Sequence, residues 1–249
     1  MSKDPNTFVI SVGGSLIIPN DEIDHRFLKK FRRLILNQLK QTPSTGSPST
    51  GSPSTGSGSK KKFFLVAGGG TTARKYSQAA ERVVKIAPDD LDWLGIHSSR
   101  LNAHLLRTIF REQAHPEIIK NPTIHMEAKE NIVVGGGWKP GWSTDYVATM
   151  IAQEYEVDKV VTLTNIDYVY DKDPKKDPSA QKIKQATWQE FRELVGDEWT
   201  PGLNTPFDPI ATKKAQKLNL EVAIMNGTDL PNLRKYLNGE KFKGTVIKD

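Results

Sequence analysis

The feature that most constrains the fold is a pattern that occurs three times along the chain. A short run of apolar and β-branched residues ends in a cluster of glycines, and a helix-like segment follows. The three junctions lie at Val12–Gly14, Ala67–Gly70 and Val134–Gly137. Continuous apolar runs are typical of strands that are buried on both faces of a parallel sheet. The pattern therefore predicts an α/β fold, with a mostly parallel central sheet sandwiched by helices.

The rest of the chain continues this alternation. Strands are predicted at Thr7–Val12, Lys62–Ala67, Asn131–Val134, Lys159–Leu163, Glu221–Met225 and Thr245–Ile247. Helices are predicted at about 27–35, 72–84, 89–110, 145–155, 188–195, 208–218 and 229–237. Asp21 is expected to cap the first helix, Asp89 or Asp90 the third, and Ser143 or Thr144 the fourth. Ligands of such folds bind beyond the carboxyl ends of the strands, where the glycine clusters lie.

Composition excludes several classes of protein. The 249 residues include no cysteine, so disulfides and thiolate metal sites are ruled out. No apolar run approaches the roughly 20 residues that span a bilayer, and the N-terminus lacks the apolar core of a signal peptide. We therefore expect a cytoplasmic protein without a membrane partner. The net charge of +6 suits an anionic substrate, but no motif indicates nucleic acid as a partner.

Residues 42–59 form a low-complexity segment between a predicted helix and a predicted strand. Pro-Ser-Thr-Gly-Ser occurs there three times in succession, and the segment contains no apolar residue. It cannot join a core, so it is expected to be a flexible tether. The regular period favours an engineered linker, and a natural insertion in a surface loop is the alternative.

Three glycine clusters at strand ends point to phosphate binding. Glycine allows a close approach of the backbone, and the N–H groups of such loops and of the helices after them attract phosphate. A single cluster is more often a turn, whereas three in one chain favour a phosphate site. The first cluster, Gly13-Gly14-Ser15, belongs to neither a Walker loop nor a dinucleotide-binding fingerprint.

Seven segments, which cover nearly the whole chain outside 42–60, resemble the archaeal-type uridylate kinases of the amino-acid-kinase superfamily. They are Val12–Pro19, Val66–Tyr76, Asp92–Leu106, Val133–Ala152, Thr162–Ala180, Phe207–Lys213 and Met225–Thr228, in family order. The resemblance implies one domain, 1–249, with an N-terminal lobe of about 1–155 for UMP and a C-terminal lobe of about 156–249 for ATP. It implies transfer of the ATP γ-phosphoryl group to UMP, as a step of pyrimidine biosynthesis, by a hexamer. Mg²⁺ is expected to be held by ATP oxygens and water, with no metal-ligating residue assigned.

The resemblance also implies roles for acceptor-side residues. It places the UMP phosphate at Gly69, Gly70 and Arg74 and the ribose at Asp92, with Gly137 and Thr144 as further nucleotide contacts. From the residues alone, Arg74 lies one turn into a helix and can reach a phosphate held at the helix start. A surface arginine and a helix-capping Asp92 are the alternatives.

On the donor side, the resemblance implies ATP contacts at Ser15, Thr164, Asn165, Tyr170 and Asp173. It makes Lys213 a ligand of the β- and γ-phosphates and Asp145 the acid that orients lysines around the transferring group. The backbone N–H groups of Gly13 and Gly14 are expected to spread the charge. The alternatives are a first-turn acid for Asp145, a core aromatic for Tyr170 and a solvated lysine for Lys213.

The chain departs from wider family patterns in three ways. It has no lysine in or just before the first glycine loop, although the archaeal-type branch also lacks this lysine. Tyr168 replaces a glycine that is usual in the family, and Trp142 stands where histidine is common. Two other functions remain open: a kinase for another small phosphate or carboxylate acceptor, and a nucleotide-binding storage or assembly scaffold without turnover. The joint presence of Arg74, Asp145 and Lys213 favours the enzyme, while the sequence does not decide between UMP and CMP.

Overall fold

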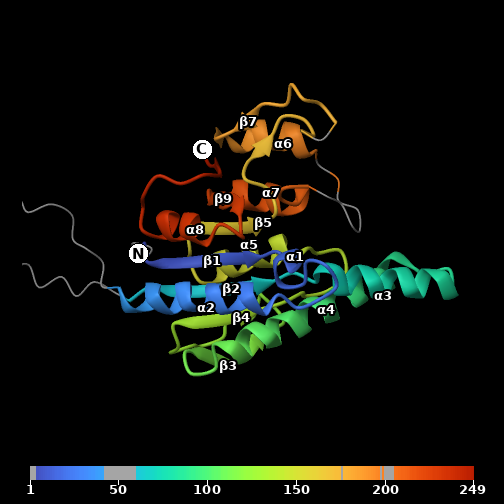
Figure 1. Cartoon of the computed structure of the whole chain (residues 1–249), viewed down its shortest axis with the longest axis horizontal. Helices are drawn as coiled ribbons and strands as arrows, with labels where there is room; N and C mark the ends of the chain where they lie inside the picture. The colour runs from blue at the N-terminus through green and yellow to red at the C-terminus, as the bar shows by residue number, and fades with distance from the viewer. Residues whose placement is uncertain (1–3, 42–59, 175, 197, 199–204) are drawn as a thin grey trace, which may run out of the picture.

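The computed structural model describes residues 4–41, 60–174, 176–196, 198 and 205–249. The predicted tether at 42–59 lies outside the described residues. The strands, most of which Figure 1 labels, are β1 (Thr7–Val12), β2 (Lys62–Ala67), β3 (Ala114–Ile119), β4 (Ile132–Gly135), β5 (Lys159–Thr164), β6 (Val169–Tyr170), β7 (Lys182–Ile183), β8 (Gln185–Ala186), β9 (Glu221–Asn226) and β10 (Thr245–Ile247). The helices are α1 (Gly14–Ile17), α2 (His25–Lys40), α3 (Gly70–Val83), α4 (Pro88–Ile109), α5 (Thr144–Glu154), α6 (Trp188–Val195), α7 (Pro209–Lys217) and α8 (Leu230–Leu237).

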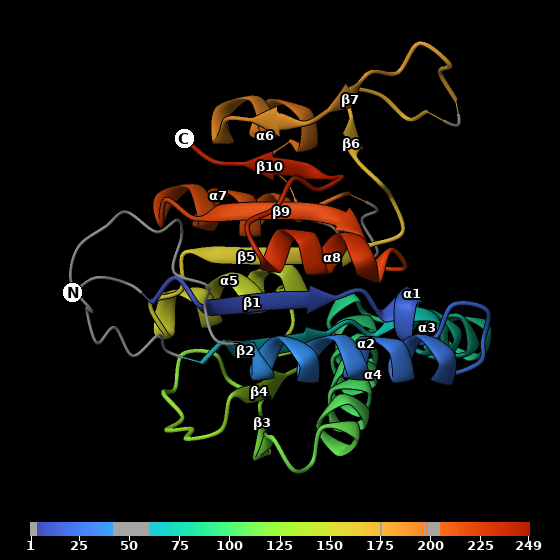
Figure 2. The ribbon, with the colours of Figure 1, turned by 60° about the vertical axis from the view of Figure 1, so that its left-hand side comes forward.

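Eight of the described strands form one large sheet in the order β3-β4-β2-β1-β5-β9-β10-β8. β1 lies inside it between β2 and β5 and is parallel to both. Only the pairing of β9 with β10 is antiparallel in this sheet. β6 and β7 form a separate antiparallel pair, from which a long connection extends at the top of Figure 2. The predicted α/β class with a mostly parallel sheet is confirmed.

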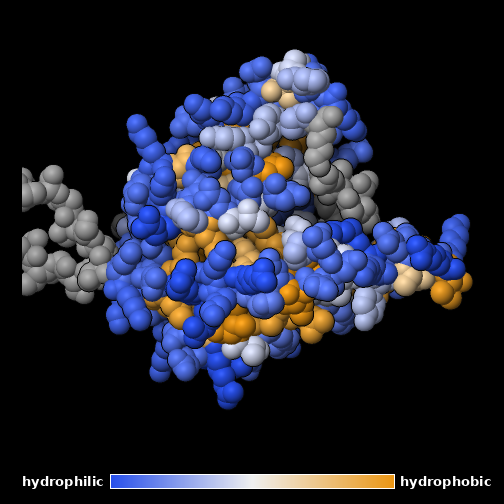
Figure 3. All heavy atoms as spheres, viewed as in Figure 1, coloured by the Kyte–Doolittle hydropathy of each residue, from blue (hydrophilic) through white to orange (hydrophobic). Residues whose placement is uncertain are grey.

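Helices cover both faces of the sheet because strand side chains alternate between two apolar cores. In β1, Ile10 and Val12 face the core that α1, α2, α4 and α8 complete. Val9, the neighbour of Ile10 in the strand, faces the core completed by α5, α6 and α7. α3 differs from these helices because none of its residues is buried, and it extends away from the sheet in Figure 1. An apolar patch appears at its end in Figure 3, where Val83 is 86% exposed.

The sequence pattern fails at β3, which it does not predict. Pro116 and the exposed Glu117 interrupt the apolar run, so neither a strand nor a helix period is visible. β3 is the outermost strand on its side of the sheet, and its register with β4 shifts between Ala114 and Ile118. Proline is tolerated at such an edge, where its missing N–H leaves no ladder partner unpaired.

Two predicted helix caps are wrong. The N-cap of α2 is Asp24, whose side chain accepts from two backbone N–H groups of the first turn. Asp21 lies earlier in the connection with a φ of 70°. α4 begins at Pro88 after an N-cap of Ala87, so Asp89 and Asp90 lie in its first turn instead of capping it. Proline at the first helical position has no N–H to leave unsatisfied, which explains the earlier start.

The order of the strands reverses between β1 and β5. From β1 the chain passes through β2 to β4 on one side of the sheet, and it then crosses to β5 and β9 on the other. Ligands of open α/β sheets bind at such a reversal, beyond the carboxyl ends of the strands. None of the described helices has the length and apolar character needed to cross a membrane.

Candidate active site

The first two glycine clusters lie in direct backbone contact. Because β1 and β2 are parallel neighbours in register, both clusters leave the sheet side by side. A Cβ atom on Gly14 would lie 2.1 Å from the backbone nitrogen of Gly70. A Cβ atom on Gly68 would lie 2.7 Å from the nitrogen of Gly14. Only glycine permits this approach, since the colliding atoms belong to backbone.

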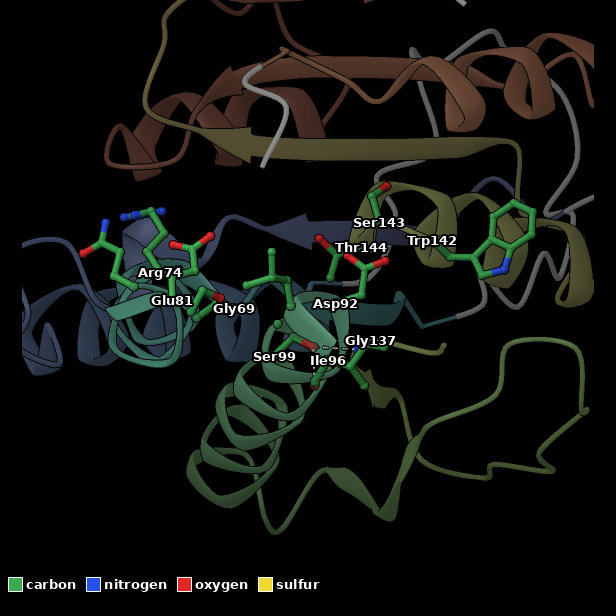
Figure 4. Close-up of a pocket in the computed structure, with 16 residues that line it drawn as sticks. Gly69, Arg74, Glu81, Asp92, Ile96, Ser99, Gly137, Trp142, Ser143 and Thr144 are labelled. Carbon is green, nitrogen blue, oxygen red and sulfur yellow. Dashed lines mark hydrogen bonds between the residues drawn. The ribbon is translucent and has the colours of Figure 1, made fainter. Parts of the chain in front are cut away.

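A cavity of about 520 Å³ opens beside this contact, between α3, α4 and the start of α5 (Figure 4). All six residues predicted for the acceptor side line it: Gly69, Gly70, Arg74, Asp92, Gly137 and Thr144. The lining also includes Glu81 on α3, Ser99 on α4 and Trp142 before α5. The structure therefore brings together residues from the second and third glycine junctions and from the helix between them.

One end of the cavity is the N-terminus of α3. Its N-cap is Gly69, and no side chain caps the first turn. The first-turn N–H groups carry the positive end of the helix dipole. Arg74 lies one turn further on, and its Nη2 donates to the hydroxyl of Thr71 at 2.8 Å. Backbone donors and a guanidinium at one helix terminus suit a phosphate group.

Asp92 links α4 to the third glycine loop. Its Oδ2 accepts a hydrogen bond from the backbone N–H of Gly141 at 2.7 Å. The capping alternative for Asp92 is wrong, because the N-cap of α4 is Ala87. A carboxylate can accept several hydrogen bonds, so Asp92 can hold the loop and still accept from a ligand hydroxyl.

Two hydroxyl residues at the start of α5 line the cavity, and one of them also caps the helix. Ser143 is the N-cap, and its hydroxyl accepts from the backbone N–H of Tyr146 at 3.1 Å. Thr144 is the first helical residue, and both side chains line the cavity. The sequence left the cap open between these two residues, and the structure assigns it to Ser143.

An aromatic stack precedes α5. The rings of Trp142 and Tyr146 stack with centroids 4.0 Å apart, and those of Trp138 and Trp142 with centroids 6.1 Å apart. The ammonium of Lys139 lies 4.3 Å from the centroid of the Trp138 ring. In Figure 4 the indole of Trp142 lies at the end of the cavity opposite Arg74. The stack therefore stiffens the loop at that end.

Asp145 is the candidate residue with the most perturbed charge. α5 packs against β1 and α7, and Oδ1 of Asp145 accepts from the hydroxyl of Ser11 at 3.2 Å. Burial raises the pKa of Asp145 from 3.8 to about 7, and the negative charge of Asp208 also raises it. The hydrogen bonds from Ser11 and from the backbone of Asp208 lower the pKa and only partly offset these effects. Near neutral pH this carboxyl is therefore present in both protonation states.

Asp208 is also part of α7, because it caps that helix. Its Oδ1 accepts from the backbone N–H groups of Ile210 at 2.6 Å and Ala211 at 2.9 Å. Lys213 follows in the second turn of α7 and is exposed. The N-terminus of α7 thus brings Asp208 close to Asp145.

The predicted donor-side residues lie in two places. Ser15 in α1 follows β1, and Thr164 and Asn165 lie at the end of β5, the strand beside β1. The N–H of Gly13 donates to the carbonyl of Leu163 at 2.9 Å and so joins these two strand ends. Tyr170 lies in β6, and Asp173 is exposed in the connection to β7. None of these residues is among the described residues that line the acceptor cavity.

Comparison with known proteins identifies the family. A match to the amino acid kinase family spans residues 6–226. The chain belongs to this family. This amino acid kinase is 32% identical over 244 residues to the uridylate kinase of Methanospirillum hungatei JF-1, which covers 97% of the chain and 94% of the relative. It is 37% identical over 188 residues to the uridylate kinase of Hyperthermus butylicus, and this alignment covers 75% of the chain and 82% of the relative.

Solved structures agree on the fold of this amino acid kinase. The uridylate kinase from Archaeoglobus fulgidus superposes with a TM-score of 0.75 at 29% identity, covering 96% of the chain and 99% of that protein. The UMP kinase from Ureaplasma parvum superposes with a TM-score of 0.73 at 19% identity and full coverage of both chains, which speaks for the fold alone.

Three polar residues of α4 in this kinase contact the glycine loops, and no role is predicted for them from the sequence. They are Ser99, Arg100 and Asn102. Ser99 and Asn102 are 2% exposed, on a helix whose other buried positions are mostly small or apolar. Polar residues on the buried face of an amphipathic helix are the sequence signal by which such contacts can be found.

Proposed function

We propose that this amino acid kinase transfers the γ-phosphoryl group of ATP to UMP and forms UDP and ADP. The observation that carries the proposal is the single cavity that the six acceptor-side residues line together. The choice of UMP is supported by relatives named uridylate kinase, among them two that are 37% and 31% identical to this chain.

In this proposal the UMP phosphate lies at the N-terminus of α3. Backbone N–H groups of Gly69 and Gly70 and the guanidinium of Arg74 bind its oxygens, a combination that suits a dianion. Asp92 accepts hydrogen bonds from the ribose hydroxyls. Gly137 and Thr144 border the remainder of the nucleotide at the far end of the cavity.

ATP binds on the side of β5, in the C-terminal lobe that begins at about residue 156. Ser15, Thr164 and Asn165 lie at adjacent strand ends there, which supports their role as contacts for the phosphates. Tyr170 and Asp173 contact the nucleoside end of ATP, and Lys213 binds the β- and γ-phosphates. The proximity of the two strand ends to the acceptor cavity sets the γ-phosphoryl group next to the UMP phosphate.

Mg²⁺ accompanies ATP in this proposal. The carboxyl groups of Asp145 and Asp208 fit a cation that ATP carries to this place, because the negative charge of Asp208 raises the cost of a second negative charge on Asp145. Among the described residues no group of three or more His, Asp or Glu side chains could hold a metal ion. ATP oxygens and water are therefore the proposed ligands, and the ion supplies charge neutralisation on the transferring group.

The transfer itself needs positioning and charge neutralisation. The UMP phosphate is largely dianionic at neutral pH, since its second pKa is near 6, so no general base is required. The backbone of Gly14 lies beside Gly70, next to the proposed acceptor phosphate, so its N–H can spread the charge there. The N–H of Gly13, proposed for the same role, donates instead to the carbonyl of Leu163. Asp145 lies behind this loop, held by Ser11, and is proposed to orient Lys213.

We also propose the remaining properties that the family resemblance implies. These are action in the cytoplasm in pyrimidine biosynthesis, a division into two lobes at about residue 155, and assembly into a hexamer. Exposed apolar side chains on α3 and α4, among them Tyr76, Val83 and Leu101, support self-association. Light scattering after size-exclusion chromatography measures the assembly directly, and a monomer at micromolar concentration would contradict it.

The test of the reaction is an assay of ADP release with MgATP and one acceptor at a time. UMP, CMP, AMP and isopentenyl phosphate are compared, the last being disfavoured because Val66–Ala73 contains no histidine. We expect turnover with UMP that is lost in Lys213→Ala and kept in Lys217→Ala, an exposed lysine of the same helix. Binding of ATP without turnover on any acceptor would refute the proposal and favour the nucleotide-binding scaffold.

A further inference from the structure

Asn102 connects α4 to the second glycine loop. Its Nδ2 donates to the carbonyl oxygen of Gly68 at 2.7 Å and to that of Gly69 at 3.3 Å. Asn102 is 2% exposed, so this contact is sheltered from water. An amide donor that is this deeply buried has no solvent to replace the two carbonyls.

Arg100 and Ser99 connect the same helix to the third glycine loop. The guanidinium of Arg100 donates from Nε to the carbonyl of Gly137 at 2.9 Å and from Nη2 to that of Trp138 at 2.8 Å. The hydroxyl of Ser99 accepts from the N–H of Gly137 at 2.8 Å and donates to the carbonyl of Ile96. Consecutive residues of α4 therefore fix three polar groups of one short loop, as the dashed lines near Ser99 in Figure 4 partly show.

Holding a carbonyl also sets the direction of an N–H group. A trans peptide is planar, and its C=O and N–H point in opposite directions. When Asn102 holds the carbonyl of Gly68, the N–H of Gly69 points to the opposite side of the loop. The same reasoning applies to Arg100, which directs the N–H groups after Gly137 and Trp138 away from its guanidinium. Glycine has little preference of its own between such orientations, so the side chains decide it.

We propose that Asn102 and Arg100 are positioning residues for the acceptor nucleotide, one for each glycine loop. Asn102 orients the second loop, at the phosphate end of the cavity, and Arg100 orients the third loop, at the nucleoside end. The proposal rests on the proposed function, because that function places UMP in this cavity. The two residues touch neither substrate nor reacting atoms, and they act through the peptide groups that they hold.

Because Asn102 and Arg100 support opposite ends of the cavity, their substitutions should affect the binding of the phosphate and of the nucleoside differently. A general structural role would not produce this difference. Calorimetric titrations compare UMP with uridine, which lacks the phosphate. We expect Asn102→Ala to weaken UMP binding about tenfold or more and to leave uridine binding unchanged. Arg100→Lys keeps the positive charge but loses the paired hydrogen bonds to the two carbonyls. We expect it to weaken the binding of UMP and of uridine by the same factor.

Controls separate these effects from a loss of folding. Arg111→Lys changes an exposed arginine just beyond the same helix and should bind both ligands like the wild type. Circular dichroism and thermal unfolding establish the folded fraction of each variant. If Asn102→Ala does not fold, Asn102→Ser retains a shorter donor and is expected to shift the UMP-to-uridine ratio in the same direction.

The outcomes distinguish this inference from the function on which it rests. Wild-type protein that binds neither UMP nor uridine refutes the proposed function and this inference with it. Wild-type binding of UMP, combined with variants that bind both ligands normally, overturns the inference alone. Equal weakening of both ligands in a folded Asn102 variant also overturns it, because the phosphate end would then have no separate support.

Discussion

Replacing Asp145 with asparagine should stabilise the protein without nucleotide at alkaline pH. The folded state holds this carboxyl at a pKa of about 7, whereas its ordinary value is 3.8. The difference of about 3 units corresponds to about 4 kcal/mol, since one unit equals about 1.4 kcal/mol. Asparagine keeps one acceptor for Ser11 but has no second one, which costs about 1 kcal/mol. The net gain above pH 7 is therefore about 3 kcal/mol.

The sign of the pH dependence follows from proton binding. Between pH 3.8 and about 7 the folded protein binds more protons at Asp145 than the unfolded chain does. The free energy of unfolding contributed by this group therefore falls as the pH rises through that window. The penalty is absent below the window and complete above it. Between pH 5 and pH 8 the stability of Asp145→Asn relative to wild type should rise by about 2–3 kcal/mol.

Urea denaturation of both proteins at several pH values, with EDTA and without nucleotide, measures this difference. Taking the difference between the two proteins cancels the titrating groups that do not interact with Asp145. Glu117→Gln removes an exposed carboxylate from β3 and should give a difference from wild type that does not change with pH. A relative stability of Asp145→Asn that stays constant between pH 5 and pH 8 would refute the reasoning, because it would mean that Asp145 titrates alike in both states.

Three further substitutions test the acceptor cavity. Gly14→Ala puts a Cβ atom 2.1 Å from the nitrogen of Gly70, so we expect the free energy of unfolding to fall by about 1–3 kcal/mol and the KM for UMP to rise. Gly95→Ala, inside α4, meets no atom within 4 Å, and alanine is favoured over glycine in a helix, so this control should be at least as stable as wild type. Arg74→Ala should raise the KM for UMP by about 10- to 100-fold in steady-state assays and leave the KM for ATP unchanged, since it removes charged hydrogen bonds to phosphate. Trp142→Ala breaks the aromatic stack and should raise the KM for UMP by about 2- to 10-fold, and an effect on the KM for ATP alone would contradict its placement at the acceptor end.

The parts of the fold that sequence predicts well are those with a strong local signal. The bounds of β1 and β2 match the structure residue for residue, because each is a continuous apolar run that glycine ends. β3 has no such signal, since Pro116 and polar neighbours hide an edge strand that only its pairing with β4 defines. The antiparallel orientation of β10 likewise depends on its partner β9 and not on its own three residues.

The candidate site divides in the same way. Glycines at strand ends and an arginine one turn into the following helix can be recognised locally, and the cavity brings these residues together. The contacts of Asn102 and Arg100 join residues more than 30 positions apart, so a local pattern can mark these residues as polar positions of a helix but does not indicate their partners. The effect of Asp208 on Asp145 likewise depends on how α5 packs against α7, and the sequence leaves that packing open.

The first glycine loop is the one element that the acceptor and donor sides share. On one side Gly14 touches the backbone of Gly70, at the start of α3, whose N-terminus forms one end of the acceptor cavity. On the other side the N–H of Gly13 is bound to Leu163, one residue before the predicted donor contacts Thr164 and Asn165. Both contacts are made by backbone, which cannot change rotamer as a side chain can. If both substrates bind as proposed, the separation of their phosphate groups is set by the pairing of β1 with β2 and β5, and any shift of the loop moves it relative to both substrates at once.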